Sequence, residues 1–239
     1  MIEDNGQMRQ GPPKYKEEEY IRMNWRDYFT DIYGKEAAKE WLPRLEKRIQ
    51  EAGRTLQNKT ADSGNQNVIL ITYPDQFYGE ENKLTLFERF AEKYLDGVFD
   101  VIHFLPFCPY SSDDGFSVID YKSLNDGLGG WENLERLSER YTLMYDFVCN
   151  HVSAKSKWFL NCLAGDKTYE NFFIEKNPDE DLSMVTRPRT TPLLTRFSTA
   201  DGDKYFWTTF SEDQIDLNYH NPSVFWAAVD IFLTYLERG

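Results

Sequence analysis

The chain has few cysteines, few histidines, no excess of basic charge and no long apolar run. Its three cysteines, Cys108, Cys149 and Cys162, are odd in number and form no CxxC pair, so neither a disulfide framework nor a zinc knuckle is predicted. Reduced thiols are typical of a cytoplasmic protein. The three histidines show no HxH or HExxH spacing, and no metal is expected.

The formal net charge at pH 7 is −13, from 27 basic and 40 acidic residues. Nucleic-acid binding needs a basic face that replaces counterions, and no Lys/Arg block would form one. Neither nucleic acid nor an anionic membrane is therefore an expected partner. No apolar run approaches the roughly 20 residues of a membrane-spanning helix, and the first residues lack the basic and apolar regions of a signal peptide. A cytoplasmic location is expected.

The first part of the chain is predicted to be a tail followed by helices. Residues 1–16 are polar and are expected to be disordered. Residues 17–66 are interpreted as a helical extension and linker, in which Trp41, Leu45 and Ile49 recur every four residues. Gly34 is expected to separate two helices and Gly53 to end the second.

From residue 67 onward, short apolar runs alternate with helical stretches. The runs at 67–73, 101–105 and 143–148 are typical of strands buried on both faces. Helical patterns cover 84–94 and 131–140. This alternation predicts an α/β fold with a parallel sheet, and residues 67–151 are interpreted as three βα units.

The alternation stops after the third strand. Residues 152–221 are too long for an ordinary connection and are predicted to form an inserted subdomain. Residues 222–239 are predicted to be a helix that has Asn221 as its N-cap and Pro222 as its first residue. Because three strands cannot close a barrel, and an open parallel sheet needs cover, the chain is expected to be part of a larger fold.

Polar and aromatic side chains follow each predicted strand. Asp75 follows the first strand, Asp113 and Phe116 the second, and Asn150 with His151 the third. In α/β barrels such residues meet at one rim. Carboxylates accept hydrogen bonds from sugar hydroxyls, and an aromatic ring stacks on a pyranose. The pattern predicts a sugar or polyol pocket.

Simpler interpretations exist for several of these residues. The run Asp113-Asp114-Gly115 is an ordinary turn signal. His103 lies inside a strand and is expected to be packed and hydrogen-bonded, and His220 is expected to have a local role. No GxSxG, GxGxxG or GxxxxGK[ST] motif is present. Spacing alone names no reaction.

The segment Asp146-Phe-Val-Cys-Asn150-His151 resembles the DxxxNH motif of the α-amylase superfamily, glycoside hydrolase family 13. Further segments follow in the order and spacing of its sucrose phosphorylase branch: Asp113-Asp-Gly-Phe116, Arg187-Pro-Arg189 with Leu193-Leu-Thr195, and Gln214-Ile-Asp-Leu-Asn218. This resemblance covers residue 67 to the end. The earlier helical stretch, with Asp31-Ile-Tyr-Gly34, is more similar to the glucosylglycerate and sucrose-6-phosphate phosphorylases.

The resemblance implies a partial (β/α)₈ TIM barrel and a retaining α-glucosyl phosphorylase of carbohydrate metabolism. Such an enzyme transfers glucose from sucrose or glucosylglycerate to inorganic phosphate, its co-substrate, and gives glucose 1-phosphate. By resemblance, Asp113 holds glucose hydroxyls, Phe116 stacks on the ring and His151 contacts a hydroxyl. Arg189 matches a loop arginine that meets phosphate or an anionic acceptor.

Three further residues are expected to support that site, again by resemblance. Asn150 and Gln214 lie behind the substrate contacts, and Asp75 has a structural role at a strand end. In amylases the position of Asn150 is often tied to calcium, whereas phosphorylases of this branch are usually metal-free. No cofactor is therefore expected.

The resemblance also places the nucleophile, an Asp in an RLDA-like fourth strand, and the acid/base Glu after the fifth strand beyond residue 239. The chain is predicted to hold no catalytic residue and to be inactive alone, with a missing carboxy-terminal half as a candidate partner. Three alternatives stay open: a fragment of an α-glucoside hydrolase, a non-catalytic sugar-binding remnant, and one half of a split enzyme.

Overall fold

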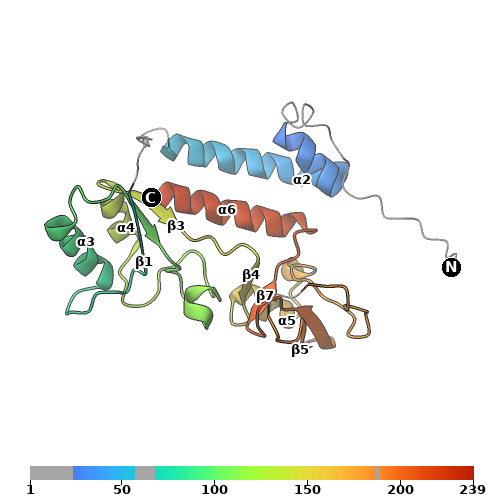
Figure 1. The fold of residues 1–239 in the computed structure, drawn as a ribbon. Coiled ribbons are helices and arrows are strands. Elements are labelled where there is room, and N and C mark those ends of the chain that lie inside the picture. Colours follow the sequence, from blue (N-terminus) through green and yellow to red (C-terminus); the bar gives the residue numbers. More distant parts are fainter. Residues whose placement is uncertain (1–23, 57–67, 187–188) are drawn as a thin grey trace. The chain divides into compact units, whose positions relative to one another are not determined.

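The alternation of strands and helices after residue 67 forms a three-stranded parallel sheet in the order β1-β2-β3 (Figure 1). The computed structural model describes residues 24–56, 68–186 and 189–239. Along the chain the elements are β1 (Ile69–Thr72), α3 (Lys83–Tyr94), β2 (Val101–Phe104), α4 (Trp131–Ser138) and β3 (Thr142–Tyr145). Each lies inside or next to the stretch predicted for it.

The two faces of this sheet differ in burial. Successive side chains of a strand point to opposite faces, and the register aligns Leu70, Ile102 and Leu143 on one face. Ile102 and Leu143 are buried there. On the other face Ile69, Ile71 and Met144 are 47%, 61% and 42% exposed. The first face is therefore part of the core, and on the opposite face Val101 is buried while Ile69, Ile71 and Met144 are open.

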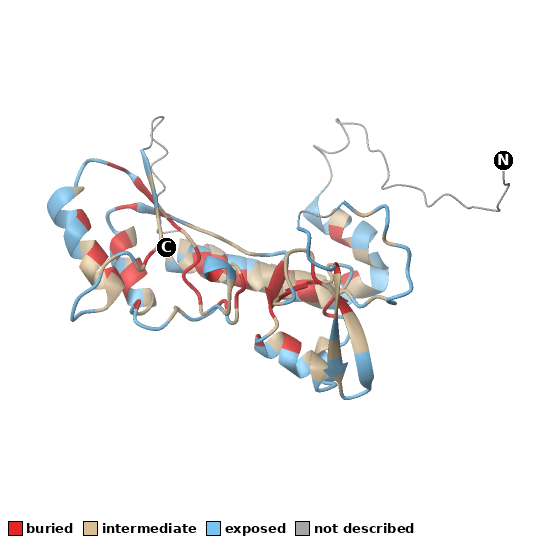
Figure 2. Ribbon diagram, turned by 60° about the horizontal axis from the view of Figure 1, so that its bottom comes forward, coloured by how far each residue is buried: buried red, intermediate tan, exposed pale blue. Residues whose placement is uncertain are grey.

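Helices α3 and α4 pack together beside the sheet. Asn82 caps α3 by accepting a hydrogen bond from the Thr85 amide at 2.9 Å. Asn133 of α4 donates to Thr85 Oγ1 at 2.9 Å. The ring of Phe87 meets that of Phe104 edge-on at 5.3 Å. Buried residues, red in Figure 2, lie on one side of these helices, as an amphipathic pattern predicts.

The stretch after β3 forms two antiparallel ladders. Its elements are β4 (His151–Ser153), α5 (Lys157–Leu163), η2 (Lys167–Tyr169), β5 (Leu194–Thr199), β6 (Gly202–Trp207) and β7 (Gln214–Asp216). β4 pairs with β7, and β5 pairs with β6. Phe159, Phe173 and Phe206 are buried, and the Phe159 ring contacts the other two. These rings belong to the same hydrophobic core as the buried residues of the sheet.

The last helix, α6 (Pro222–Arg238), begins as predicted, because Asn221 accepts a hydrogen bond from the Ser223 amide at 3.0 Å. It is tied to Arg48 of the preceding helical segment. The Arg48 guanidinium lies 2.6 Å from Asp230 Oδ1 and 2.7 Å from Glu237 Oε1. All three side chains are largely buried, so these ion pairs anchor residues near Arg48 to α6.

Helix α2 (Trp25–Leu56) contains a break at Gly34, whose φ of 83° is in the left-handed region that glycine adopts at no steric cost. The predicted separation at Gly34 is thus present as a kink. The predicted end at Gly53 was wrong, since the helix continues to Leu56. A lone glycine costs only about 1 kcal/mol inside a helix. Of the apolar residues predicted to recur along this helix, Leu45 is buried and Ile49 is exposed.

The chain divides into two compact units, Met1–Arg44 and Leu45–Gly239. In the first unit, Phe29 and Tyr33 stack along α2 with ring centroids 4.6 Å apart. The second unit contains the elements from β1 to α6. The predicted tail, 1–16, and most of the predicted linker lie outside the described residues. Among the helices in the described ranges, none has the length and apolar character needed to cross a membrane.

Candidate functional site

Three segments far apart in the sequence meet next to the carboxyl end of β2. The first is the loop after β2, which contains the short 3₁₀ helix η1 (Asp113–Gly115). The second is the start of β4 at His151, and the third is the start of β7 at Gln214. Because β4 pairs with β7, His151 and Gln214 lie on neighbouring strands.

Gln214 lies between Asp113 and His151. Its side chain is only 2% exposed. Its Nε2 donates to Asp113 Oδ2 at 2.9 Å and lies 3.2 Å from His151 Nε2. Its Oε1 accepts a hydrogen bond from Ser211 Oγ at 2.9 Å, which fixes the orientation of the amide. The amide group therefore presents its donor side to the Asp113 carboxylate.

His151 is buried and bonded on both ring nitrogens. Nε2 lies 3.0 Å from the carbonyl oxygen of Phe116, and Nδ1 lies 3.3 Å from Asn150 Nδ2. A carbonyl only accepts and an amide nitrogen only donates, so the Phe116 carbonyl and the Asn150 amide fit the tautomer protonated at Nε2. With Nε2 protonated, the Gln214 amide nitrogen is a second donor beside it, and the two side chains are in contact without a hydrogen bond. Burial lowers the pKa of His151, and the Phe116 carbonyl together with Asp216 and Asp113 only partly offsets this. The imidazole is thus neutral near pH 7.

We expect His151 to titrate below the usual histidine value of about 6.5. Since the unfolded chain then takes up the proton first, the free energy of unfolding falls as the pH drops through about 6.5 and towards the folded-state pKa. NMR titration of isotope-labelled histidines measures this midpoint. A His151 midpoint at or above about 6.5 would contradict the burial argument.

Two further side chains surround His151. Asp216 faces it in the β4–β7 register and is buried. It accepts hydrogen bonds from the Thr209 amide at 3.1 Å and from Thr209 Oγ1 at 2.5 Å. Burial raises the pKa of Asp216 against the lowering effect of these bonds. The Phe210 ring lies 5.2 Å from the imidazole. Neither residue was singled out from the sequence, although Asp216 lies within the Gln214–Asn218 segment.

The backbone at Asp113 adopts an unusual conformation. Asp113 and Asp114 have φ values of 57° and 49°, in the left-handed region. Gly115 is buried against Pro106, where an added Cβ would lie 2.6 Å from Pro106 Cβ. The turn leaves the Asp113 carboxylate exposed next to Gln214, while the Phe116 side chain is half-buried. The carboxylate keeps acceptor capacity for a ligand.

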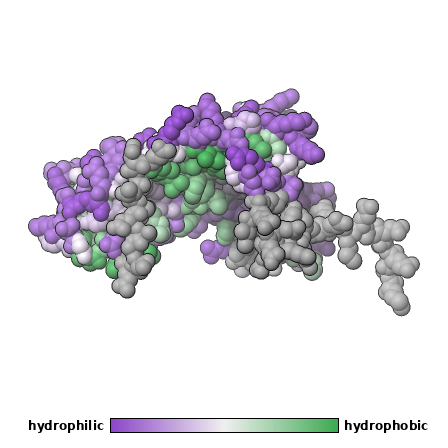
Figure 3. All heavy atoms as spheres, turned by 90° about the horizontal axis from the view of Figure 1, so that it is seen from above, coloured by the Kyte–Doolittle hydropathy of each residue, from purple (hydrophilic) through white to green (hydrophobic). Residues whose placement is uncertain are grey.

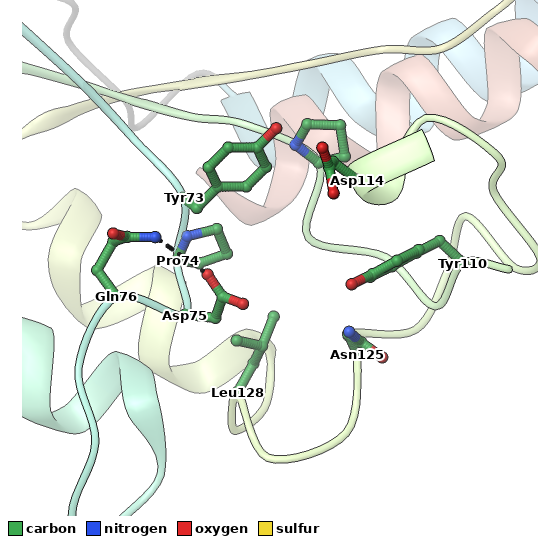
Figure 4. Close-up of a pocket in the computed structure, with 9 residues that line it drawn as sticks. Tyr73, Pro74, Asp75, Gln76, Tyr110, Asp114, Asn125 and Leu128 are labelled. Carbon is green, nitrogen blue, oxygen red and sulfur yellow. Dashed lines mark hydrogen bonds between the residues drawn. The ribbon is translucent and has the colours of Figure 1, made fainter. Parts of the chain in front are cut away.

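Asp75 lines a separate cavity of about 280 Å³ between the loops that follow β1 and β2 (Figure 4). Polar and apolar groups contribute equally to its wall, and the polar residues are Tyr73, Asp75, Gln76, Tyr110, Asp114 and Asn125. Burial and nearby carboxylates, first among them Asp114, raise the pKa of Tyr73. The cavity offers acceptors and hydroxyl donors, a set that suits a polyhydroxylated ligand. Asp75 thus faces this cavity, and no contact in the described structure joins it to Asp113.

Arg189 lies on an exposed stretch before β5. Among the residues that the structure describes, no hydrogen bond or ion pair joins Arg189 to Asp113, Phe116 or His151. His103 is half-buried, and its Nε2 lies 3.2 Å from Asp146 Oδ1, in agreement with a packed, hydrogen-bonded strand residue. The cluster therefore consists of Asp113, the Phe116 carbonyl, Asn150, His151 and Gln214.

The part of the chain that contains this cluster matches a known protein family. The family described as "Alpha amylase, catalytic domain" matches residues 93–239, a span that contains every member of the cluster. The chain belongs to the alpha-amylase family. Its fold is accordingly a partial, TIM-barrel-like α/β fold.

Within the alpha-amylase family the chain is similar to hexosyl phosphorylases. It is 47% identical over 222 residues to the glucosylglycerate phosphorylase of Escherichia coli (strain K12). This match covers 92% of this chain and 40% of that protein. It is 31% identical to the sucrose phosphorylase of Streptococcus mutans, over 63% of this chain and 33% of that protein. The chain thus spans about 40% of the length of the curated relatives that it matches over most of its length.

A solved structure shows the same similarity. The crystal structure of sucrose 6F-phosphate phosphorylase from Thermoanaerobacter thermosaccharolyticum matches with a TM-score of 0.64 and 29% identity. The match covers 71% of this chain and 37% of that one. The resemblance drawn from the motifs, to the phosphorylases of the alpha-amylase family, is therefore confirmed.

Proposed function

We propose that this chain forms the glucose-binding part of a retaining α-glucosyl phosphorylase that acts on glucosylglycerate. The observation that carries the proposal is that Gln214 bonds to Asp113 and lies against His151, which brings these two residues together on the loops that follow parallel strands. The similarity to glucosylglycerate phosphorylase, 47% over 92% of the chain, favours this donor over sucrose.

We assign β1, β2 and β3 to the first three strands of a (β/α)₈ barrel, with residues 152–221 as the inserted subdomain. Two features support this assignment. The strands are parallel and ordered β1-β2-β3. One sheet face exposes Ile69, Ile71 and Met144, whereas parallel sheets are normally covered on both faces. An apolar area bordered by hydrophilic residues is also visible in Figure 3. The rest of a barrel would cover such surface.

In this proposal the chain binds the glucosyl ring, and the catalytic carboxylates come from sequence outside it. A carboxylate attacks C1 as the bond from C1 to the glycerate oxygen breaks and a carboxylic acid protonates that oxygen. A phosphate oxygen then attacks C1 and releases the carboxylate, which gives glucose 1-phosphate with retained configuration. Asp113 accepts hydrogen bonds from glucose hydroxyls, and Phe116 packs on the ring.

The imidazole of His151 also belongs to this proposed subsite. Its Nε2–H bonds to the Phe116 carbonyl in the described structure, so a sugar hydroxyl would share or replace that bond. Exposed Arg189 would meet phosphate or the glycerate carboxylate, for which a planar cation with several donors is suited. The proposed reaction needs inorganic phosphate as co-substrate and no other cofactor.

The test is to join this chain to the part of the E. coli relative that it does not cover. Glucose 1-phosphate formation is measured with glucosylglycerate or sucrose, each with and without inorganic phosphate. We expect turnover that depends on phosphate and prefers glucosylglycerate, and no turnover by the 239-residue chain alone. Phosphate-independent release of free glucose would indicate a hydrolase instead.

A correctly folded joined enzyme that turns over neither donor would reject the proposal. Glucose binding without turnover would then point to a sugar-binding protein. Circular dichroism and size-exclusion chromatography of the joined protein separate that result from a failure to fold.

A further inference from the structure

The loop between β2 and the strand-like bridge at Val118 holds Asp113 in a conformation that an isolated chain avoids. Left-handed backbone costs roughly 1–2 kcal/mol per non-glycine residue, and both Asp113 and Asp114 adopt it. Such strain persists only where surrounding contacts impose it. The contacts made by Asp113 itself are few, because its side chain is exposed and bonds to Gln214.

The contacts that impose this loop conformation converge on Asp213. Its Oδ2 lies 2.5 Å from Ser111 Oγ, 2.5 Å from Ser112 Oγ and 2.9 Å from Ser117 Oγ. Its Oδ1 lies 3.3 Å from Ser153 Oγ. We call these five residues the Asp213–serine cluster. A carboxylate is suited to this position because it accepts several hydrogen bonds at once and donates none.

The serines of the cluster lie on both sides of the turn in the sequence. Ser111 and Ser112 precede Asp113, and Ser117 follows Phe116. Backbone bonds run in the same place: Ser117 N to Ser112 O at 3.3 Å, and Ser111 N to Ser117 O at 3.1 Å. Backbone hydrogen bonds therefore link the two ends of the short turn that carries Asp113, and Asp213 accepts hydrogen bonds from the serines at both ends.

The cluster also joins this turn to the strands that carry the other site residues. Ser153 belongs to β4, which starts at His151, and its amide donates to Val118 O at 2.8 Å. Asp213 O accepts from the Ala154 amide at 3.0 Å and from Ser117 Oγ at 2.8 Å. Asp213 directly precedes Gln214, which bonds to Asp113. One residue thus contacts both sides of the proposed sugar site.

We propose that Asp213 is a positioning residue that sets the placement of Asp113 relative to His151 for binding the glucosyl ring. The inference rests on the proposed function for the identity of the ligand and on the contacts above for the positioning itself. Asp213 acts through the serines and touches no substrate. Burial raises the pKa of Asp213, but the hydrogen bonds from the four hydroxyls together outweigh it and hold the pKa below its usual value, so the acceptor stays ionised.

The first test measures amide hydrogen exchange by mass spectrometry in this chain. Asp213→Ala should speed exchange at residues 111–119 about tenfold or more, since their amides lose the contacts that hold the loop. Asp213→Asn, which keeps one acceptor oxygen, should show a smaller increase. Helix α3 (Lys83–Tyr94) should be unaffected. Glu212→Gln removes the same charge at an exposed neighbouring residue and should match the wild type.

Either of two results would overturn positioning by Asp213. One is unchanged exchange at 111–119 in Asp213→Ala. The other is an equal increase in α3, which would show general destabilisation. This measurement involves no glucoside, so it stands apart from the proposed function.

The second test uses the joined enzyme. Asp213→Asn should raise the KM for glucosylglycerate about tenfold or more and change kcat less. The KM for phosphate should not change. Asp213→Ala should raise the KM for glucosylglycerate further than Asp213→Asn does. Equal KM values in wild type and both variants would show that the loop does not position the sugar. Altered exchange together with a wild-type enzyme that never turns over would reject only the proposed function.

Discussion

Replacing Asp113 by asparagine is expected to lower kcat/KM for glucosyl transfer about 10²–10⁴-fold in the joined enzyme. A hydrogen bond to a charged group contributes roughly 1.5–3 kcal/mol, and two such bonds to sugar hydroxyls correspond to this range at 1.36 kcal/mol for each factor of ten. Asparagine tolerates the left-handed backbone found at Asp113, so the effect reports the lost charge. Initial rates with glucosylglycerate and phosphate provide the measurement.

The matched control is Asp126→Asn, which makes the same chemical change at an exposed position outside the cluster. It should leave the rate within about twofold, as expected for a surface substitution. If Asp113→Asn and Asp126→Asn gave the same rate, Asp113 would not bind the transferred sugar.

Replacing Phe159 by alanine is expected to destabilise the region around β5 and β6 by about 3–5 kcal/mol, the usual range for a buried phenylalanine. The Phe159 side chain is fully buried. Its ring meets those of Phe173, Phe197 and Phe206 edge-on, with centroids 5.0, 4.8 and 5.1 Å away. The substitution removes the Phe159 ring from its contacts with these three rings and leaves a cavity in its place.

Urea denaturation followed by tryptophan fluorescence measures this loss, since Trp158 and Trp207 lie in the same region. Leu160→Ala on the same helix is the control, because Leu160 is 50% exposed and its truncation should cost less than about 1 kcal/mol. Similar midpoints for the two variants would show that the aromatic cluster contributes little.

The fold after residue 67 was predictable because its pattern is local. Short apolar runs predicted β1, β2 and β3, and a capping asparagine followed by proline predicted the start of α6. The end of α2 was not predictable from the sequence. A glycine at position 53 only weakens a helix, and neighbouring contacts decide whether the helix ends there. Ion pairs from Arg48 to α6 lie a few residues before Gly53.

The candidate site was predictable in its members and less so in its connections. Strand ends and motif spacing indicated Asp113, His151 and Gln214. Nothing local indicates that the Phe116 carbonyl would bond to the imidazole, or that Asp216 and Phe210 would surround it. The pattern also did not indicate that Asp75 lies apart from Asp113 and His151, facing another cavity. These contacts join residues many positions apart, and sequence spacing does not encode such distances.

The sequence by itself determined the family, the parallel strands and the residue types suited to a sugar, because each of these depends on short segments read in order. The tertiary structure alone decided how four serines surround the Asp213 carboxylate at the turn that carries Asp113, and how Gln214 comes to lie between that turn and His151. The physical reason is that a strained turn takes its shape from contacts supplied by distant segments, and those contacts exist only once the chain has folded.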